Sequence, residues 1–193
     1  MKGAFIVFEG IDGTGKSSVC TAVSESLSGR GYDVVTTFEP TAGPIGSLVR
    51  SKGFGPLAEA LLFAADRAEH TAWIRESVQG GKVVLCDRYF ASSLAYQSAA
   101  GVDPAWIRAI NAPGMVEPDL TILMDAPVGV GLERVNGRGR ATRFEDAEYL
   151  ERVRSAYVEY ARETGCAVLD ATAPAAEVAG RALELILGRL EGI

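Results

Sequence analysis

The sequence has little of several residue types on which common kinds of site depend. Among its 193 residues are one histidine, His70, and three widely separated cysteines, Cys20, Cys86 and Cys166. Without a second histidine or a C-x-x-C pair, neither a zinc site nor a disulfide framework is indicated. We therefore expect no chemistry at His70, and thiols that stay reduced in a cytoplasmic protein.

Positive charge is also scarce. Lys and Arg number 19 against 25 Asp and Glu, which gives a formal net charge of −6. Such a chain has no basic field to draw it to nucleic acid or to an anionic membrane, and it has no run of membrane-spanning length. We expect neither partner, and anionic ligands must be bound locally. Trp73 and Trp106 have no accompanying basic groove, so they are expected to pack helices.

What the sequence does contain is a regular alternation of strands and helices. Helical stretches, beginning at 16–28 and ending at 175–190, separate five short apolar or β-branched runs. The runs are residues 4–8, 33–37, 83–86, 120–124 and 167–169. This pattern predicts one α/β domain over residues 1–193, with three layers: a five-stranded parallel sheet and helices on both of its faces. Ligands bind such sheets beyond the carboxyl ends of the strands.

The strongest motif follows the first predicted strand. Residues 10–17 read G-I-D-G-T-G-K-S and match the phosphate-binding loop G-x-x-x-x-G-K-[ST], where a helix begins. Its backbone N–H groups and the helix N-terminus can surround phosphate, while Lys16 reaches the β and γ oxygens and Ser17 meets Mg²⁺. An ordinary glycine-rich turn would not need the Lys-Ser pair. The motif predicts a P-loop NTPase fold and an ATP site at Gly10, Ile11, Asp12, Gly13, Thr14, Gly15, Lys16, Ser17 and Ser18.

Other residues narrow the choice among P-loop proteins. No Asn-Lys pair occurs, so the N-K-x-D element of a GTPase is missing. The strand at 83–86 runs into Asp87, which is placed to hold Mg²⁺ with Ser17, and into Arg88, which can grip phosphate with two hydrogen bonds. This pair favours an enzyme with two phosphorylated ligands over a surface ion pair. A non-catalytic ATP-binding module remains an alternative.

Three segments resemble the thymidylate kinase family: residues 8–18 (F-E-G-I-D-G-T-G-K-S-S), 62–67 (L-F-A-A-D-R) and 87–97 (D-R-Y-F-A-S-S-L-A-Y-Q). The match continues through Glu39-Pro40 and residues 118–125, 143–145 and 169–171. The resemblance implies ATP- and Mg²⁺-dependent phosphorylation of thymidine monophosphate (dTMP) to the diphosphate, supporting dTTP synthesis, by a homodimer. A kinase for another nucleotide or for a nucleoside is the rival among enzymes.

The resemblance also implies roles in an acceptor site. Phe63 would stack on thymine, Arg67 would donate to its carbonyl, Asp12 would meet the sugar hydroxyl, and Tyr96 would crowd the 2′ position. By helical spacing alone, Phe63 could be core and Arg67 solvated. Two arginines, Arg50 and Arg88, would clamp the acceptor phosphate. The remaining positions of the acceptor site are Glu39, Ser92, Ser93 and Gln97.

A glycine-rich basic segment is expected to be a lid over approximately residues 136–147, although an ordinary solvated loop is the plainer alternative. Some family members carry an arginine at the position of Gly13, so here the catalytic charge is expected from the lid, with Lys16 and Arg88. The candidate lid residues are Arg138, Arg140 and Arg143. Arg134 and Ala171 would lie against adenine.

Overall fold

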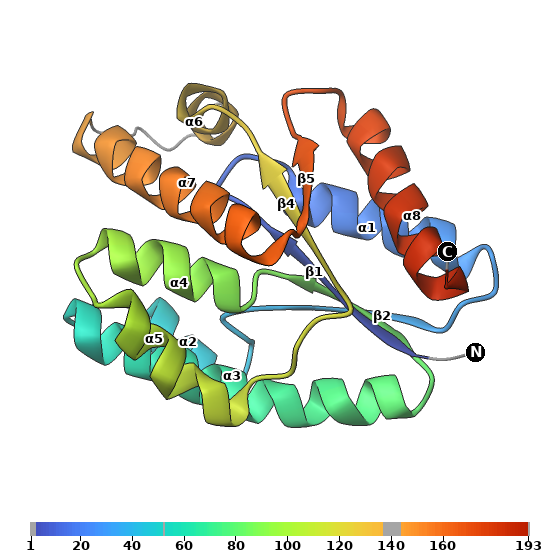
Figure 1. Cartoon of the computed structure of the whole chain (residues 1–193), viewed down its shortest axis with the longest axis horizontal. Coiled ribbons are helices and arrows are strands. Elements are labelled where there is room, and N and C mark those ends of the chain that lie inside the picture. The colour runs from blue at the N-terminus through green and yellow to red at the C-terminus, as the bar shows by residue number, and fades with distance from the viewer. Residues whose placement is uncertain (1–2, 52, 137–143, 193) are drawn as a thin grey trace.

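A five-stranded parallel sheet lies at the centre of the molecule (Figure 1). The computed structural model describes residues 3–51, 53–136 and 144–192. Its strands are β1 (Ala4–Glu9), β2 (Val34–Phe38), β3 (Val83–Asp87), β4 (Leu120–Asp125) and β5 (Ala167–Asp170), in the order β2-β3-β1-β4-β5. All neighbouring strands pair in parallel, which confirms the predicted fold. The strand ends differ from the predicted ones by at most one residue.

Helices connect the strands in the predicted alternation. The first is α1, and its predicted bounds of 16–28 are confirmed. Prolines stand in the first turns of α2, α3 and α5, where a missing N–H costs nothing. The helices are α1 (Lys16–Ser28), α2 (Pro44–Arg50), α3 (Pro56–Gln79), α4 (Phe90–Ala99), α5 (Pro104–Asn111), α6 (Val128–Asn136), α7 (Phe144–Thr164) and α8 (Ala175–Glu191). None of the described helices is both long and apolar enough to cross a membrane.

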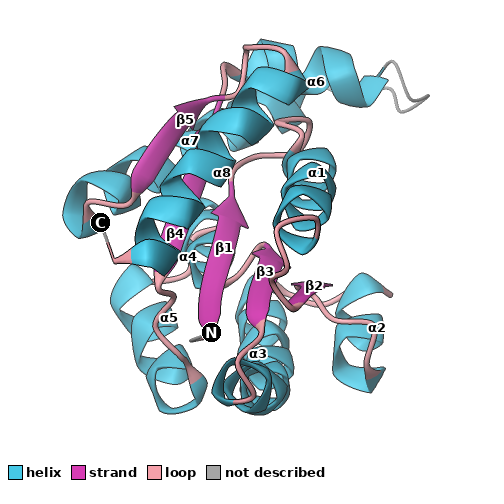
Figure 2. Cartoon of the chain, turned by 90° about the vertical axis from the view of Figure 1, so that its right-hand side faces the viewer, coloured by secondary structure: helices cyan, strands magenta, loops and turns pink. Residues whose placement is uncertain are grey.

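The helices cover the sheet on both faces because its strands are apolar on both. Ile6 and Phe8 of β1 pack with α1 and α8, whereas Phe5 and Val7 pack with α3, α4 and α5. This alternation follows from the two-residue period of a strand. Figures 1 and 2 show α1 and α8 on one side of the sheet and α3, α4, α5 and α7 on the other.

The strand order brings the two motifs together. The chain leaves β1 for β2 but later continues with β4 on the other side of β1, so β1 and β3 flank the switch point of the sheet. Phe8 is in register with Asp87, and the N–H of Arg88 donates to the carbonyl oxygen of Phe8 at 2.9 Å. The P-loop and the Asp87-Arg88 pair therefore lie together at the carboxyl ends of β1 and β3.

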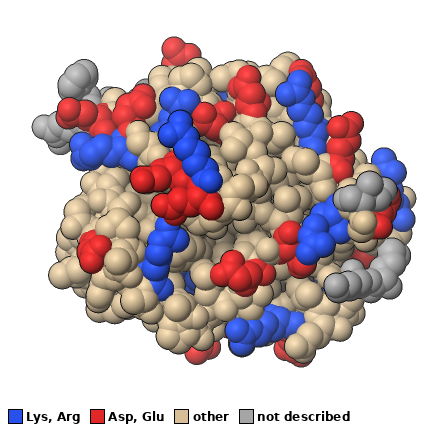
Figure 3. Space-filling model, viewed as in Figure 1, with Lys and Arg blue, Asp and Glu red and all other residues tan. Residues whose placement is uncertain are grey.

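On the face of the molecule shown in Figure 3, basic and acidic side chains are interspersed.

Candidate active site

The P-loop forms one wall of an open pocket of about 430 Å³, called here the P-loop pocket. Gly10, Gly13 and Gly15 have positive φ, which L side chains rarely adopt. Two predicted residues, Gly10 and Ile11, are buried and do not line this pocket. The Ile11 carbonyl accepts from Lys16 Nζ at 2.8 Å and from Thr14 Oγ1 at 3.0 Å. The pocket is lined by Asp12, Gly13, Gly15, Lys16, Ser17, Ser18, Asp87, Arg88 and Val135.

Lys16 is the principal cation of this pocket, and it is buried. Burial, assisted by the charge of Arg88, lowers the pKa of Lys16 to about 7, although Asp87, Asp12 and Glu9 act in the opposite direction. A dense anion placed beside Nζ favours the charged ammonium. Binding of a phosphate in this pocket would therefore favour protonation of Lys16.

Gly13 is required by a close approach of α6 to the P-loop. A Cβ at Gly13 would lie 2.1 Å from the carbonyl oxygen of Gly131, and a Cβ at Gly131 would lie 2.6 Å from that of Asp12. The side chain of an arginine at position 13 would meet that same backbone atom. The contact with α6 therefore favours glycine at this position.

Asp87 and Ser17 fit a divalent cation. Asp87 Oδ2 accepts a short hydrogen bond from Ser17 Oγ, while the buried Oδ1 has no partner among the described residues. No group of three or more His, Cys, Asp or Glu side chains forms a possible cage in the described part of the chain. One carboxylate, one hydroxyl and open space for phosphate suit Mg²⁺, which keeps several waters and relies on substrate phosphates.

A second pocket, the α8 pocket, extends from the back of the P-loop toward the start of α8 and has a volume of about 460 Å³. Predicted residues Arg134 and Ala171 both line it. Arg134 NH1 donates to the carbonyl oxygen of Ala171 at 2.8 Å, which leaves the flat guanidinium at the pocket wall. A planar group of this kind can stack on a base.

A third pocket, the small pocket, has a volume of about 170 Å³ and collects all the predicted acceptor residues except Arg50. Phe63 is half-buried and faces this pocket instead of belonging to the core clusters. Gln97 Oε1 is buried without a partner among the described residues. The lining consists of Asp12, Glu39, Pro40, Phe63, Arg67, Arg88, Tyr89, Ser92, Ser93, Tyr96 and Gln97.

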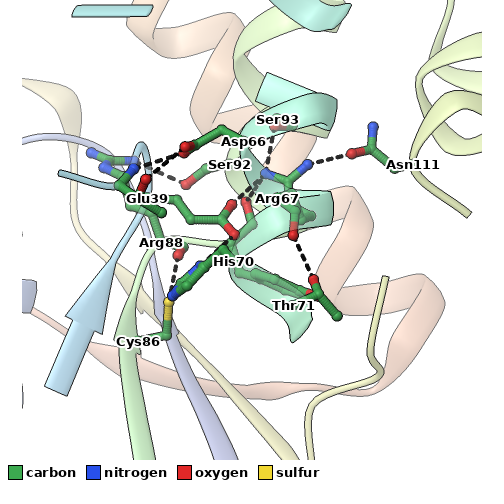
Figure 4. Close-up of polar contacts among 12 residues, drawn as sticks. Glu39, Asp66, Arg67, His70, Thr71, Cys86, Arg88, Ser92, Ser93 and Asn111 are labelled. Atoms are coloured by element: carbon green, nitrogen blue, oxygen red, sulfur yellow. Dashed lines mark hydrogen bonds and ion pairs between the residues drawn. The ribbon is translucent and has the colours of Figure 1, made fainter. Parts of the chain in front are cut away.

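Arg67 is 1% exposed, so the alternative of a solvated arginine is wrong. Its NH2 donates to Glu39 Oε2 at 2.7 Å and to Ser93 Oγ at 2.8 Å, and its NH1 donates to Asn111 Oδ1 (Figure 4). Tyr89 packs against the guanidinium, whose centre is 5.2 Å from the ring centroid. Arg67 therefore carries its charge into the pocket in one fixed orientation.

Arg88 connects the P-loop pocket to the small pocket, because it lines both. Its φ of 73° places a non-glycine residue in the left-handed region, a strain often found at functional sites. NH2 donates to Asp12 Oδ1 at 2.7 Å, NH1 to the Gly10 carbonyl at 3.0 Å, and the guanidinium lies over the Tyr96 ring at 5.2 Å. Its ion pair is thus with Asp12 and not with Asp87.

Two residues that hold Arg88 in place were not predicted: Glu9 and Tyr157. Glu9 Oε2 accepts from Ser92 Oγ at 2.5 Å and from Tyr157 OH at 3.2 Å, and Arg88 NH1 donates to both of those hydroxyls. Burial raises the pKa of Glu9, while the Ser92 hydrogen bond and the Arg88 charge oppose that rise. The position of Glu9 beside the P-loop was the available signal. Tyr157 lies on a distant helix and gave none.

One predicted acceptor residue, Arg50, lines none of these three pockets. Arg50 is exposed at the end of α2, where NH1 donates to the Pro40 carbonyl at 2.6 Å. The predicted lid residues Arg138, Arg140 and Arg143 lie outside the described residues.

His70 and the two tryptophans can also be compared with expectation. His70, expected to be uninvolved, is buried and bonds to Glu39. Trp106 packs against the apolar cluster beneath α3–α5, as expected. Trp73 is 42% exposed and stacks on the His70 ring, so the prediction of a packing residue does not hold for it.

A P-loop at the switch point of a parallel sheet, with a small polar pocket sharing an arginine with it, defines a P-loop phosphotransferase with two neighbouring ligands. A family model described as thymidylate kinase matches residues 8–181. A "Probable thymidylate kinase" of Thermococcus onnurineus is 45% identical over 81% of this chain and 83% of its own length. The "Thymidylate kinase" of Desulfovibrio desulfuricans is 42% identical over 90% of each. The chain belongs to the thymidylate kinase family.

Proposed function

We propose that this kinase transfers the γ-phosphoryl group of ATP, bound at the P-loop, to dTMP bound in the small pocket. The observation that carries the proposal is the position of Arg88, which lines both pockets and so lies where the donor and acceptor phosphates would meet. Two phosphates repel each other, and a shared guanidinium offsets that repulsion while aligning the attacking oxygen.

The catalytic roles follow from charge. Lys16 contacts the β and γ oxygens, and Arg88 holds the acceptor phosphate beside them. Arg50 would join Arg88 at that phosphate, and its bond to the carbonyl oxygen of Pro40, a residue that lines the small pocket, supports this role. The arginines of the predicted lid, Arg138, Arg140 and Arg143, would add positive charge to stabilise the transferred group. No general base is needed, because the acceptor phosphate is ionised at neutral pH.

Acceptor selection rests on a stacking face and a donor. Phe63 would stack on thymine, Arg67 would donate to its carbonyl oxygen, and Tyr96 would favour deoxyribose by crowding the 2′ position. Gln97 has an unpartnered buried oxygen in the same pocket, available to a base N–H. Arg134 and Ala171 would border adenine in the α8 pocket.

Ser17 and Asp87 would hold Mg²⁺ beside the phosphates. When bound, the cation neutralises charge on the phosphoryl oxygens. Asp87 supplies an open carboxylate oxygen, and Ser17 is held against its other oxygen.

The whole chain would act as one kinase domain, and two copies would form a homodimer. Support comes from large apolar side chains exposed on α2 and α3: Leu48 at 46%, Leu57 at 60% and Leu61 at 51%. Exposed groups of this kind often mark interfaces. The three free cysteines suit a reducing, cytoplasmic compartment.

The decisive experiment offers thymidine, deoxyuridine, deoxycytidine, deoxyguanosine and uridine monophosphates separately with MgATP, and measures ADP formation. Thymidine itself and an acceptor-free reaction serve as controls. We expect stoichiometric ADP and dTDP with dTMP. Preference for another acceptor would indicate the rival kinase, and turnover without acceptor dependence would favour an ATP-binding module.

A further inference from the structure

The carboxylate of Glu39 lies between two buried side chains, Arg67 and His70, and each of its oxygens contacts one of them. Oε2 accepts from Arg67 NH2 at 2.7 Å, and Oε1 contacts His70 Nδ1 at 3.0 Å (Figure 4). Glu39, Arg67 and His70 are 5%, 1% and 8% exposed, so water does not compete for these bonds. His70, the partner of Oε1, therefore fixes the orientation of the carboxylate.

The neighbours of the His70 ring indicate which of its two nitrogens carries a proton. A carboxylate only accepts hydrogen bonds, so Nδ1 must carry a proton and donate to Glu39. Nε2 faces Thr37 Oγ1 of β2 at 2.7 Å. The ring also stacks on Trp73, with centroids 5.9 Å apart and planes inclined by 13°. His70 is thus held on three sides with Nδ1–H directed at Glu39.

The orientation of the Glu39 carboxylate matters because it determines which N–H groups of Arg67 stay available to a ligand. A carboxylate tends to take two parallel N–H groups of a guanidinium, and the pair beside NH2 includes Nε. In this structure Glu39 takes NH2 alone, and Arg67 Nε is buried without a partner among the described residues. His70 occupies the oxygen that would otherwise turn toward Nε.

We propose that His70 is a positioning residue for base recognition: its Nδ1–H holds Glu39 so that Arg67 keeps a donor for the carbonyl group of a pyrimidine. The proposal rests on the function proposed above, in which Arg67 meets the base. His70 itself does not line the small pocket, so it acts only through Glu39.

Two substitutions test the contributions of the two ring nitrogens of His70 separately. In His70→Asn the side-chain amide can replace Nδ1–H, whereas in His70→Gln the amide reaches the position of Nε2 and leaves Glu39 Oε1 without its donor. Isothermal titration with dTMP alone measures acceptor affinity, and steady-state kinetics give KM for each substrate and kcat. Deoxycytidine monophosphate, whose amino group replaces the carbonyl group, serves as the competing acceptor.

We expect His70→Gln to raise the dTMP dissociation constant about ten-fold or more and to reduce discrimination against deoxycytidine monophosphate, with His70→Asn within about three-fold of the unaltered chain. KM for ATP and kcat should change by less than about two-fold in both. Equal losses in the two variants, or no loss in either, would overturn the proposal.

A third variant covers the case in which a His70 substitution does not fold. Thr37→Val keeps the shape of β2 but removes the hydroxyl facing Nε2, and should raise the dTMP dissociation constant about three-fold without changing ATP affinity. No change in dTMP affinity would count against the proposal. If the unaltered chain forms no ADP with dTMP, the proposed function fails and the role of His70 fails with it. Normal turnover with equal effects of the Asn and Gln variants overturns the role of His70 alone.

Discussion

Lys16 and Arg88 are the two cations at the centre of the proposed transfer, and oxygen acceptors hold both. Lys16 donates to the Ile11 carbonyl, and Arg88 donates to Asp12, Gly10 and two hydroxyls. Such bonds place the charges before substrate arrives, so little reorganisation remains for the reaction itself. The two cations differ in how they respond to pH.

Nucleotide binding should take up a proton at Lys16. Its lowered pKa, about 7, means that the ammonium is present below pH 7 and is lost as the pH rises through that value. Bound phosphate restores the proton, so affinity for MgADP should fall above pH 7, by at most about ten-fold per pH unit. Titration calorimetry at pH 8 in buffers of different ionisation enthalpy measures the uptake. In Lys16→Met, proton uptake by Lys16 is removed and any uptake by the nucleotide itself remains. Equal proton uptake by the variant and the unaltered protein would contradict the assignment to Lys16.

Arg88→Lys should lower kcat with dTMP by about 10²–10³-fold, because an ammonium keeps the charge but cannot span both pockets with a planar fork. Arg108→Lys is the matched control, since Arg108 forms an exposed pair with Glu163 on the surface. Steady-state kinetics with far-UV circular dichroism distinguish lost catalysis from lost folding. Equal kcat values in the two variants would argue against a role for Arg88.

Helix α6 packs closely against the phosphate loop. Its residue Gly131 lies against the backbone of Asp12 and Gly13, whereas Gly129, two residues earlier, has open space around it. The position of α6 therefore sets the position of the loop, and α6 also carries Arg134 to the α8 pocket.

Gly131→Ala should push α6 away from the P-loop, because the new Cβ would lie 2.6 Å from the Asp12 carbonyl oxygen. We expect a loss of about 1–3 kcal/mol in the free energy of unfolding and a higher KM for ATP. Gly129→Ala, in the same helix, should be neutral or stabilising by up to about 1 kcal/mol. Urea denaturation and KM measurements test the pair, and similar behaviour of the two variants would show that the contact is not limiting.

Among the described residues, several of the large apolar side chains that are exposed to water lie on two neighbouring helices, α2 and α3. Leu57 and Leu61 are one turn apart on α3, and Leu48 lies on α2, which packs against α3. Leu48, Leu57 and Leu61 do not line the P-loop pocket or the small pocket, so a second copy bound to these side chains would contact a different surface.

Leu61→Glu should shift the proposed homodimer to monomer, because a charge placed at a buried interface is costly to desolvate. Leu185→Glu, on α8 at 38% exposure, is the matched control and should leave assembly unchanged. Light scattering after size-exclusion chromatography measures the mass. A monomeric unaltered chain, or dimers in both variants, would exclude this interface.

Most of the fold and much of the site could be predicted because their signals are local. The P-loop, the strand that ends at Asp87, and the alternating elements are read from neighbouring residues, and strand ends shifted only slightly. The acceptor residues came from family resemblance, and the small pocket brings all of them except Arg50 together. The hydrogen bonds of Glu9 and Tyr157, and the contact of His70 with Glu39, were not predicted because the partners lie far apart along the chain.

By itself, then, the sequence determined the alternating strands and helices, the phosphate loop, and the position of Asp87 at the end of a strand, since each depends on a pattern among neighbouring residues. Only the tertiary structure decided that Gly13 meets Gly131, that Arg88 pairs with Asp12, and that Glu39 is shared by Arg67 and His70. Those contacts depend on how separate elements pack, and in a buried site each polar atom takes the partner that packing brings within reach.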